Sequence, residues 1–126
     1  MIYGLGTDIS KVSRFESWVK NPDMLCRFFN SCEIIEKSAG LQFLCEHYAA
    51  RFSAKEAFVK ALGTGFSGIE LKDFGIIKNP EGKPEFIFGK KTEKIIDERC
   101  GKNWKVHVSL SHEKEYAVSS AVIEVF

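Results

Sequence analysis

The longest helical pattern in the chain runs from Phe43 to Gly65, and no proline interrupts it. It predicts one helix of about 20 residues that ends at Gly63, because a glycine after the last periodic position is a common helix stop. Two apolar stripes lie on nearly opposite sides of this helix: Cys45, Tyr48, Phe52 and Val59 form one, and Ala50, Ala54, Ala57 and Ala61 form the other. A helix that is apolar on two sides is usually covered on both. We therefore expect this helix at the centre of the fold.

An alternating pattern over residues 2–10 predicts a strand before this helix. The face that we expect to lie largely in the core carries Tyr3, Leu5, Thr7 and Ile9. The other face places Gly4 and Gly6 directly before Asp8. Glycine inside a strand often marks the close approach of a ligand or of another backbone. Two interpretations remain open: the glycines clear space for a ligand beside Asp8, or they accommodate a crossing helix and Asp8 merely ends the strand.

Capping-box patterns predict short helices between the strand and the central helix. The sequence S-x-x-E that begins at Ser13 predicts a helix that breaks at residues 21–22, an Asn-Pro pair. Residues 23–29 add another turn or two. A second capping box begins at Asn30 and predicts a helix that stops at Gly40.

The second half of the chain is rich in strand patterns. Residues 74–78 and 84–88 flank an Asn-Pro-Glu-Gly-Lys turn and predict a hairpin. Residues 90–100 have helical spacing, whereas 104–111 and 116–126 predict two further strands. The expected fold is α+β, with an antiparallel sheet packed on the long central helix.

Length and charge narrow the possible classes of protein. We expect the 126 residues to form a single domain, and the net charge of +1 argues against a general nucleic-acid binder. No stretch approaches the roughly 18 apolar residues of a membrane span, and no export signal pattern is present. The four cysteines contain no C-x-x-C pair and are interpreted as free thiols in a reducing cytoplasm, with a zinc site or disulfides as the alternatives.

Two carboxylates are candidates for chemistry. Glu56 lies beside the apolar stripe of the central helix, where an unpaired charge is costly, and Asp8 follows the glycines of the first strand. Carboxylates from two elements, together with phosphate and water oxygens, suit Mg²⁺. The alternative for Glu56 is an i,i+4 salt bridge with Lys60. Lys60 itself either neutralises a phosphate or lies on a solvated edge of the helix. Arg51 and Lys55 lie on the other flank of the helix.

A second group of polar residues suits phosphate oxygens. It consists of the loop residues Gly63, Thr64 and Gly65 and the polar strand face His107, Ser109 and Ser111. The alternative is an ordinary helix C-cap and a half-exposed strand. Neither a P-loop nor a dinucleotide-binding fingerprint is present.

Four blocks of the chain closely resemble the holo-[acyl-carrier-protein] synthases, the bacterial 4′-phosphopantetheinyl transferases of fatty acid synthesis. These blocks are Gly4-x-Gly6-Thr7-Asp8-Ile9, the stretch RFSAKEAFVKALGTG from Arg51 to Gly65, Gly82-Lys83-Pro84, and His107-Val108-Ser109-Leu110-Ser111-His112. The resemblance spans almost the whole chain. It is weakest between Lys20 and Glu46, and the basic residues of the first predicted helix are sparse after Arg14.

The resemblance implies a fold, a reaction and a set of site residues. The reaction transfers phosphopantetheine from coenzyme A to a serine of apo-acyl carrier protein and releases adenosine 3′,5′-bisphosphate. Asp8 and Glu56 match the Mg²⁺ ligands of the family (Mn²⁺ is possible), Lys60 matches a phosphate contact, and Glu56 is the expected base, directly or through a metal-bound water. Segments that hold the nucleotide end match Gly63, Thr64, Gly65, His107, Ser109 and Ser111.

The resemblance also implies partners. Arg14 matches a basic position that meets the acidic carrier protein, and family members form homotrimers with each site between two protomers. A non-catalytic domain of the same fold that binds coenzyme A or a carrier protein is the alternative, and a nucleic-acid module is a third. Neither nucleic acid nor a membrane is expected as a partner.

Overall fold

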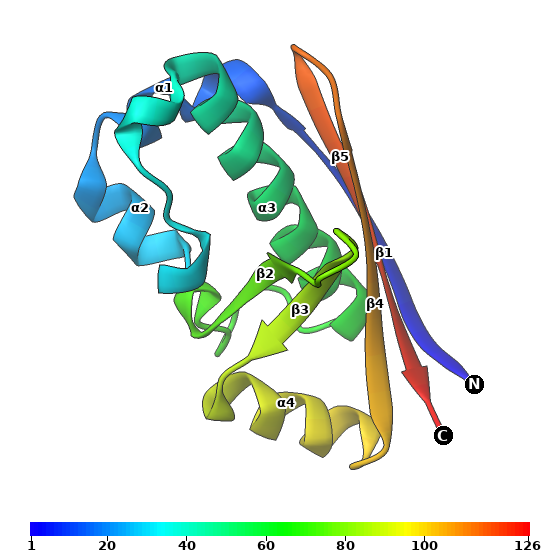
Figure 1. Ribbon diagram of the computed structural model, residues 1–126. Helices are drawn as coiled ribbons and strands as arrows, with labels where there is room; N and C mark the ends of the chain where they lie inside the picture. Colours follow the sequence, from blue (N-terminus) through cyan, green and yellow to red (C-terminus); the bar gives the residue numbers. More distant parts are fainter.

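The computed structural model describes residues 1–126 and contains two antiparallel sheets (Figure 1). Strands β1 (Ile2–Lys11), β5 (Tyr116–Val125) and β4 (Trp104–His112) form the larger sheet in the order β1-β5-β4. Strands β2 (Phe74–Lys78) and β3 (Pro84–Phe88) form the predicted hairpin. The α+β class and the antiparallel pairing predicted from the sequence are confirmed.

The central helix α3 spans Leu41–Leu62 and packs against β1 and β5 (Figure 1). It begins two residues before the predicted start at Phe43, and Gly63 ends it in the left-handed conformation with φ of 80°. Both predicted apolar stripes of this helix are buried. The prediction of a helix covered on two sides is therefore confirmed.

The glycines of β1 allow that strand to lie directly on the alanine stripe of α3. A Cβ atom on Gly4 would overlap the carbonyl oxygen of Ala61, and one on Gly6 would overlap that of Ala57. The structure therefore supports the crossing-helix interpretation of the two glycines. The other part of that interpretation is wrong, because Asp8 does not end the strand, which continues to Lys11. The prediction that the opposite face of β1 lies in the core is wrong, because Leu5 and Ile9 on that face are 66% and 62% exposed.

Two short helices lie between β1 and α3. Helix α2 (Pro22–Phe28) begins with Asn21 as its N-cap, whose Oδ1 accepts a hydrogen bond from the Met24 N–H. Helix α1 covers only Glu16–Val19 and follows a 3₁₀ turn. The capping box predicted at Ser13 does not form, since neither this turn nor α1 has a side-chain cap.

The second capping box forms, but the helix predicted to follow it does not. Asn30 and Glu33 make both reciprocal capping bonds around a single 3₁₀ turn, Ser31–Glu33. The chain then continues in an extended conformation at Ile34, and a separate 3₁₀ turn covers Lys37–Ala39. The carboxylate of Glu33 is buried and bonded to other segments, so tertiary contacts rather than helix propagation determine this stretch.

The remaining elements follow the predicted pattern. Helix α4 (Lys90–Cys100) connects the hairpin to β4 and buries Thr92 and Ile96. All four cysteines are free. None of the helices combines the length and the apolar character that crossing a membrane requires.

Candidate functional site

Asp8 lies on the side of β1 that faces α3, and its side chain is 8% exposed. One carboxylate oxygen, Oδ1, is 3.1 Å from Lys60 Nζ, and the other, Oδ2, accepts a hydrogen bond of 3.3 Å from Ser10. The Ser53 hydroxyl donates to the backbone oxygen of Asp8 at 2.9 Å. These contacts attach the carboxylate to both β1 and α3.

Glu56 is the half-buried neighbour of Asp8 on α3. Burial, followed by a hydrogen bond with Asp8 and the negative charge of Asp8, raises the pKa of Glu56 to about 7. Two carboxylates this close favour a state in which they share one proton. The alternative of an i,i+4 salt bridge between Glu56 and Lys60 is wrong, because the Lys60 ammonium instead contacts Asp8 and the backbone oxygen of Thr7.

The donor set of this pair fits a hard divalent cation. Mg²⁺ prefers oxygen ligands and takes one or two protein carboxylates, with phosphate and water oxygens completing its shell. A cation beside Asp8 and Glu56 removes the repulsion that favours the protonated form of Glu56. No group of three or more His, Cys, Asp or Glu side chains lies in a metal-binding arrangement anywhere in the chain, and this pair supplies two carboxylates.

A hollow of about 420 Å³ opens beside Glu56. Apolar side chains form much of its wall, among them Phe28, Phe52 and Phe66. Arg14 and Arg27 also line it, and no carboxylate of the chain forms a salt bridge with either arginine. The Arg14 guanidinium lies 5.3 Å from the centroid of the Phe52 ring, which fixes its direction. Sequence reasoning identified Arg14 but missed Arg27, which stands in the region of weak resemblance.

The polar face of β4 does not join the carboxylate pair within one chain. Ser109 pairs through Ser120 of β5 with Thr7 of β1, so these three residues share the sheet face that points away from α3. His107 and Ser111 occupy the same face by alternation, and His107 Nε2 lies 3.0 Å from Glu124 Oε1. Asp8 projects from the opposite face, and β1 and β4 are opposite edges of the sheet.

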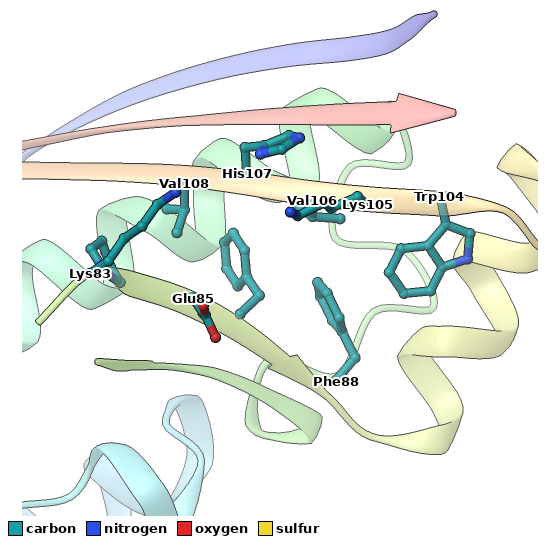
Figure 2. Close-up of a pocket in the computed structure, with 10 residues that line it drawn as sticks. Lys83, Glu85, Phe88, Trp104, Lys105, Val106, His107 and Val108 are labelled. Atoms are coloured by element: carbon teal, nitrogen blue, oxygen red, sulfur yellow. The ribbon is translucent and has the colours of Figure 1, made fainter. Parts of the chain in front are cut away.

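A second hollow, also about 420 Å³, lies between β3 and β4. Figure 2 shows Phe88 and Trp104 on one side of β4, within this hollow, and the ring of His107 on the other side. Lys83, from the Gly82-Lys83-Pro84 block, lines the same hollow. None of the three residues Asp8, Glu56 and Lys60 contributes to it.

The loop from Gly63 to Gly65 follows the C-terminus of α3, one turn beyond Lys60. The Gly63 N–H donates to Val59, so it acts as the helix cap, and the Thr64 hydroxyl donates to the Gly65 carbonyl at 2.7 Å. A helix C-terminus carries partial negative charge, so an anion near this loop requires nearby cations. Lys60 is the nearest in sequence, and Arg99 donates to the Leu62 carbonyl at 3.4 Å.

Two further basic residues of α3 behave differently from the prediction. The sequence predicts Lys55 on a helix flank, but Lys55 is fully buried and paired with Glu33. Arg51 has no carboxylate partner, its Nε is buried without a hydrogen bond, and burial lowers its pKa. No periodicity signal distinguishes Lys55 from a solvent-exposed lysine, because its partner Glu33 comes from a distant segment.

Comparison with known proteins identifies the class to which this fold and site belong. A family model described as the 4′-phosphopantetheinyl transferase superfamily matches residues 4–121. The chain therefore belongs to this superfamily and, within it, to the holo-[acyl-carrier-protein] synthases, as its relatives indicate. A holo-[acyl-carrier-protein] synthase from Treponema denticola is 42% identical over 98% of this chain and 99% of that protein.

Solved structures have the same fold. The holo-[acyl-carrier-protein] synthase of Neisseria meningitidis superimposes with a TM-score of 0.85 at 33% identity and covers 98% of this chain and 99% of its own. A synthase from Bacillus anthracis, described as a complex with coenzyme A (3′,5′-ADP), gives a TM-score of 0.77 at 30% identity, covering 100% of this chain and 99% of its own. The fold predicted from the resemblance is confirmed.

Proposed function

We propose that this protein is a holo-[acyl-carrier-protein] synthase. It transfers 4′-phosphopantetheine from coenzyme A to a serine of apo-acyl carrier protein, giving holo-carrier protein and adenosine 3′,5′-bisphosphate for fatty acid synthesis. The observation that carries this proposal is the carboxylate pair Asp8 and Glu56 with Lys60 beside it, in a full-length member of this family. Because its substrates are coenzyme A and apo-acyl carrier protein, the proposed site of action is the cytoplasm.

The residues of the pair have separate tasks. Asp8 and Glu56 hold Mg²⁺ (or Mn²⁺), which when bound offsets negative charge on the diphosphate of coenzyme A. Lys60, already directed at Asp8, supplies a further positive charge to the same phosphate. Glu56 accepts the proton of the attacking serine hydroxyl as the general base.

The nucleotide end of coenzyme A is held by two segments, the loop with Gly63, Thr64 and Gly65 and the β4 residues His107, Ser109 and Ser111. These β4 residues project from the opposite sheet face to Asp8. A second copy of the chain brings its own β4 face next to the carboxylate pair of the first. As the family resemblance implies, the proposed assembly is a homotrimer in which each site lies between two protomers.

The carrier protein docks at the hollow beside Glu56. Arg14 and Arg27 present positive charge to its acidic surface, and Phe28 and Phe66 present apolar area between them. Aromatic and arginine side chains are the residue types that most often dominate interface energetics. The serine of the carrier then lies next to the carboxylate that takes its proton.

The test is a transfer reaction with purified protein, coenzyme A, Mg²⁺ and apo-carrier protein, followed by mass spectrometry of the carrier. We expect a mass gain equal to one phosphopantetheine on the serine. Asp8→Ala and Glu56→Ala should each lower kcat/KM by about a thousandfold, with a native circular dichroism spectrum. Coenzyme A binding without any mass gain would instead indicate a non-catalytic binding domain, and full activity in both variants would refute the metal assignment.

A further inference from the structure

A buried ion pair between Lys55 and Glu33 takes no direct part in the proposed reaction. The Lys55 Nζ lies 2.6 Å from Glu33 Oε1, and both side chains are 0% exposed. The same ammonium donates to the carbonyl oxygens of Leu71 and Phe74 at 2.8 and 2.6 Å. All three of its donors are therefore used.

The carboxylate of Glu33 is equally well bonded. It accepts hydrogen bonds from the backbone N–H groups of Asn30 and Ile76 at 3.0 and 3.1 Å. Gly75 makes this approach possible, because a Cβ atom there would lie 2.9 Å from Glu33 Cδ. One ion pair thus connects the turn after α2, helix α3, and the chain from Leu71 to Ile76.

These connections end at the hollow beside Glu56. Lys55 directly precedes Glu56 on α3, and Leu71, whose carbonyl it holds, lines the hollow together with Glu56. The loop between α3 and Leu71 contributes Phe66, Ile69 and Glu70 to the same wall. Gly63 fixes the start of this loop to the helix, and Lys55 fixes its end.

A buried ion pair is a weak source of stability, because the loss of hydration offsets most of the attraction between the charges. Its geometry is nevertheless strict, since each charge requires all its partners in place. We propose that the Glu33–Lys55 pair is a positioning element that fixes the wall of the hollow relative to Glu56 and so sets its fit to the carrier protein. This inference rests on the proposed function and on the hollow as the carrier site.

Two variants disturb the pair in different ways. Glu33→Gln combined with Lys55→Met removes both charges and leaves no unpaired ion, and Gly75→Ala keeps both charges but displaces the carboxylate. In each we expect the KM for apo-carrier protein to rise about tenfold, while kcat and the KM for coenzyme A change less than about threefold. Gly75→Ala carries the test if the double variant does not fold.

The control is Ile96→Ala, which creates a cavity at a buried position of α4 and removes no contact of the Glu33–Lys55 pair. The melting temperature of each variant is measured, and KM values are compared between variants whose melting temperatures have fallen by similar amounts. Instability alone then cannot produce the difference. A wild-type KM for the carrier in either folded variant, or an equal rise in Ile96→Ala, would overturn the positioning role. Absence of transfer by the unmodified protein would instead count against the proposed function, so the two failures are distinguishable.

Discussion

Glu56 combines an acidic side chain with a helix face that is otherwise apolar, and its neighbours decide its chemistry. Burial and the adjacent Asp8 raise the pKa of Glu56 from its usual value of 4.5 to about 7. Lys60 is one helical turn away but pairs with Asp8 instead. The pair is therefore only partly ionised near neutral pH in the absence of metal, and a bound cation would displace the shared proton.

The raised pKa of Glu56 predicts a pH-dependent loss of stability without metal. Between pH 4.5 and 7 the folded protein holds a proton that the unfolded chain has released, so stability falls as pH rises through this window. Glu56→Gln removes this loss, and because the side chain is only half-buried, we expect a gain in melting temperature of only about 2–4 °C at pH 8 and none at pH 4. Thermal unfolding in a chelator measures this difference, and the exposed Glu81→Gln is the control. An equal gain at both pH values would contradict it.

Arg27 lines the hollow proposed for the carrier protein but is not among the residues proposed for the chemistry. A change at Arg27 therefore separates carrier binding from the chemical step. Arg27→Glu places a like charge against an acidic carrier, so we expect the KM for apo-carrier protein to rise about tenfold or more with little change in the KM for coenzyme A. The effect should weaken at high salt, because exposed charges are screened. Steady-state kinetics at two salt concentrations measure it, with Lys94→Glu on α4 as the control. An unchanged carrier KM would remove Arg27 from the interface.

At the scale of elements, the packing of β1 on α3 decides where Asp8 lies. The two glycines of β1 bring the strand backbone against the backbone of the helix at Ala57 and Ala61. Asp8 follows directly and is thereby brought within reach of Glu56 and Lys60. The glycines thus serve the site indirectly, by permitting close packing rather than by contacting a ligand.

Gly6→Ala tests this role of the glycines. The added Cβ overlaps the carbonyl of Ala57, so we expect a loss of about 3 kcal/mol or more in the free energy of unfolding, since the neighbour is backbone and cannot rotate away. Chemical denaturation measures the loss. Gly40→Ala is the control, because nothing lies within 4 Å of its Cβ and only its positive φ opposes the change. A loss no larger than that of the control would contradict the close-packing explanation.

At the scale of the whole molecule, the larger sheet is covered by α3 on one face and open on the other. The open face combines the polar β4 residues with exposed apolar side chains of β1 and β5, including Leu5, Ile9 and Val118. Several exposed large apolar side chains on one open sheet face are typical of an interface. The proposed homotrimer uses this face and completes each site across it.

Ile9→Lys tests the trimer. Ile9 is 62% exposed in the single chain, so the substitution leaves the monomer fold intact while placing a charge in the proposed interface. We expect trimers to dissociate in analytical ultracentrifugation and kcat/KM to fall about a hundredfold or more, since each site loses the β4 residues of the neighbouring protomer. Phe43→Lys, at an exposed position near the start of α3, is the control. Monomers with full activity would refute the shared site.

The sequence by itself determined the central helix, the glycine stop at Gly63, the hairpin and the two long strands, because each depends on periodicity or on turn residues within a few positions. It also grouped Asp8 and Glu56 as a candidate Mg²⁺ site with Lys60 nearby, as one of two open interpretations, and the resemblance favoured that interpretation.

Only the tertiary structure decided which partner each polar group takes. Lys60 pairs with Asp8 rather than Glu56, Lys55 is buried with Glu33, and the open face of β1 carries Leu5 and Ile9. These outcomes depend on contacts between segments far apart in the chain, and alternation alone does not say which face of a strand a helix will cover.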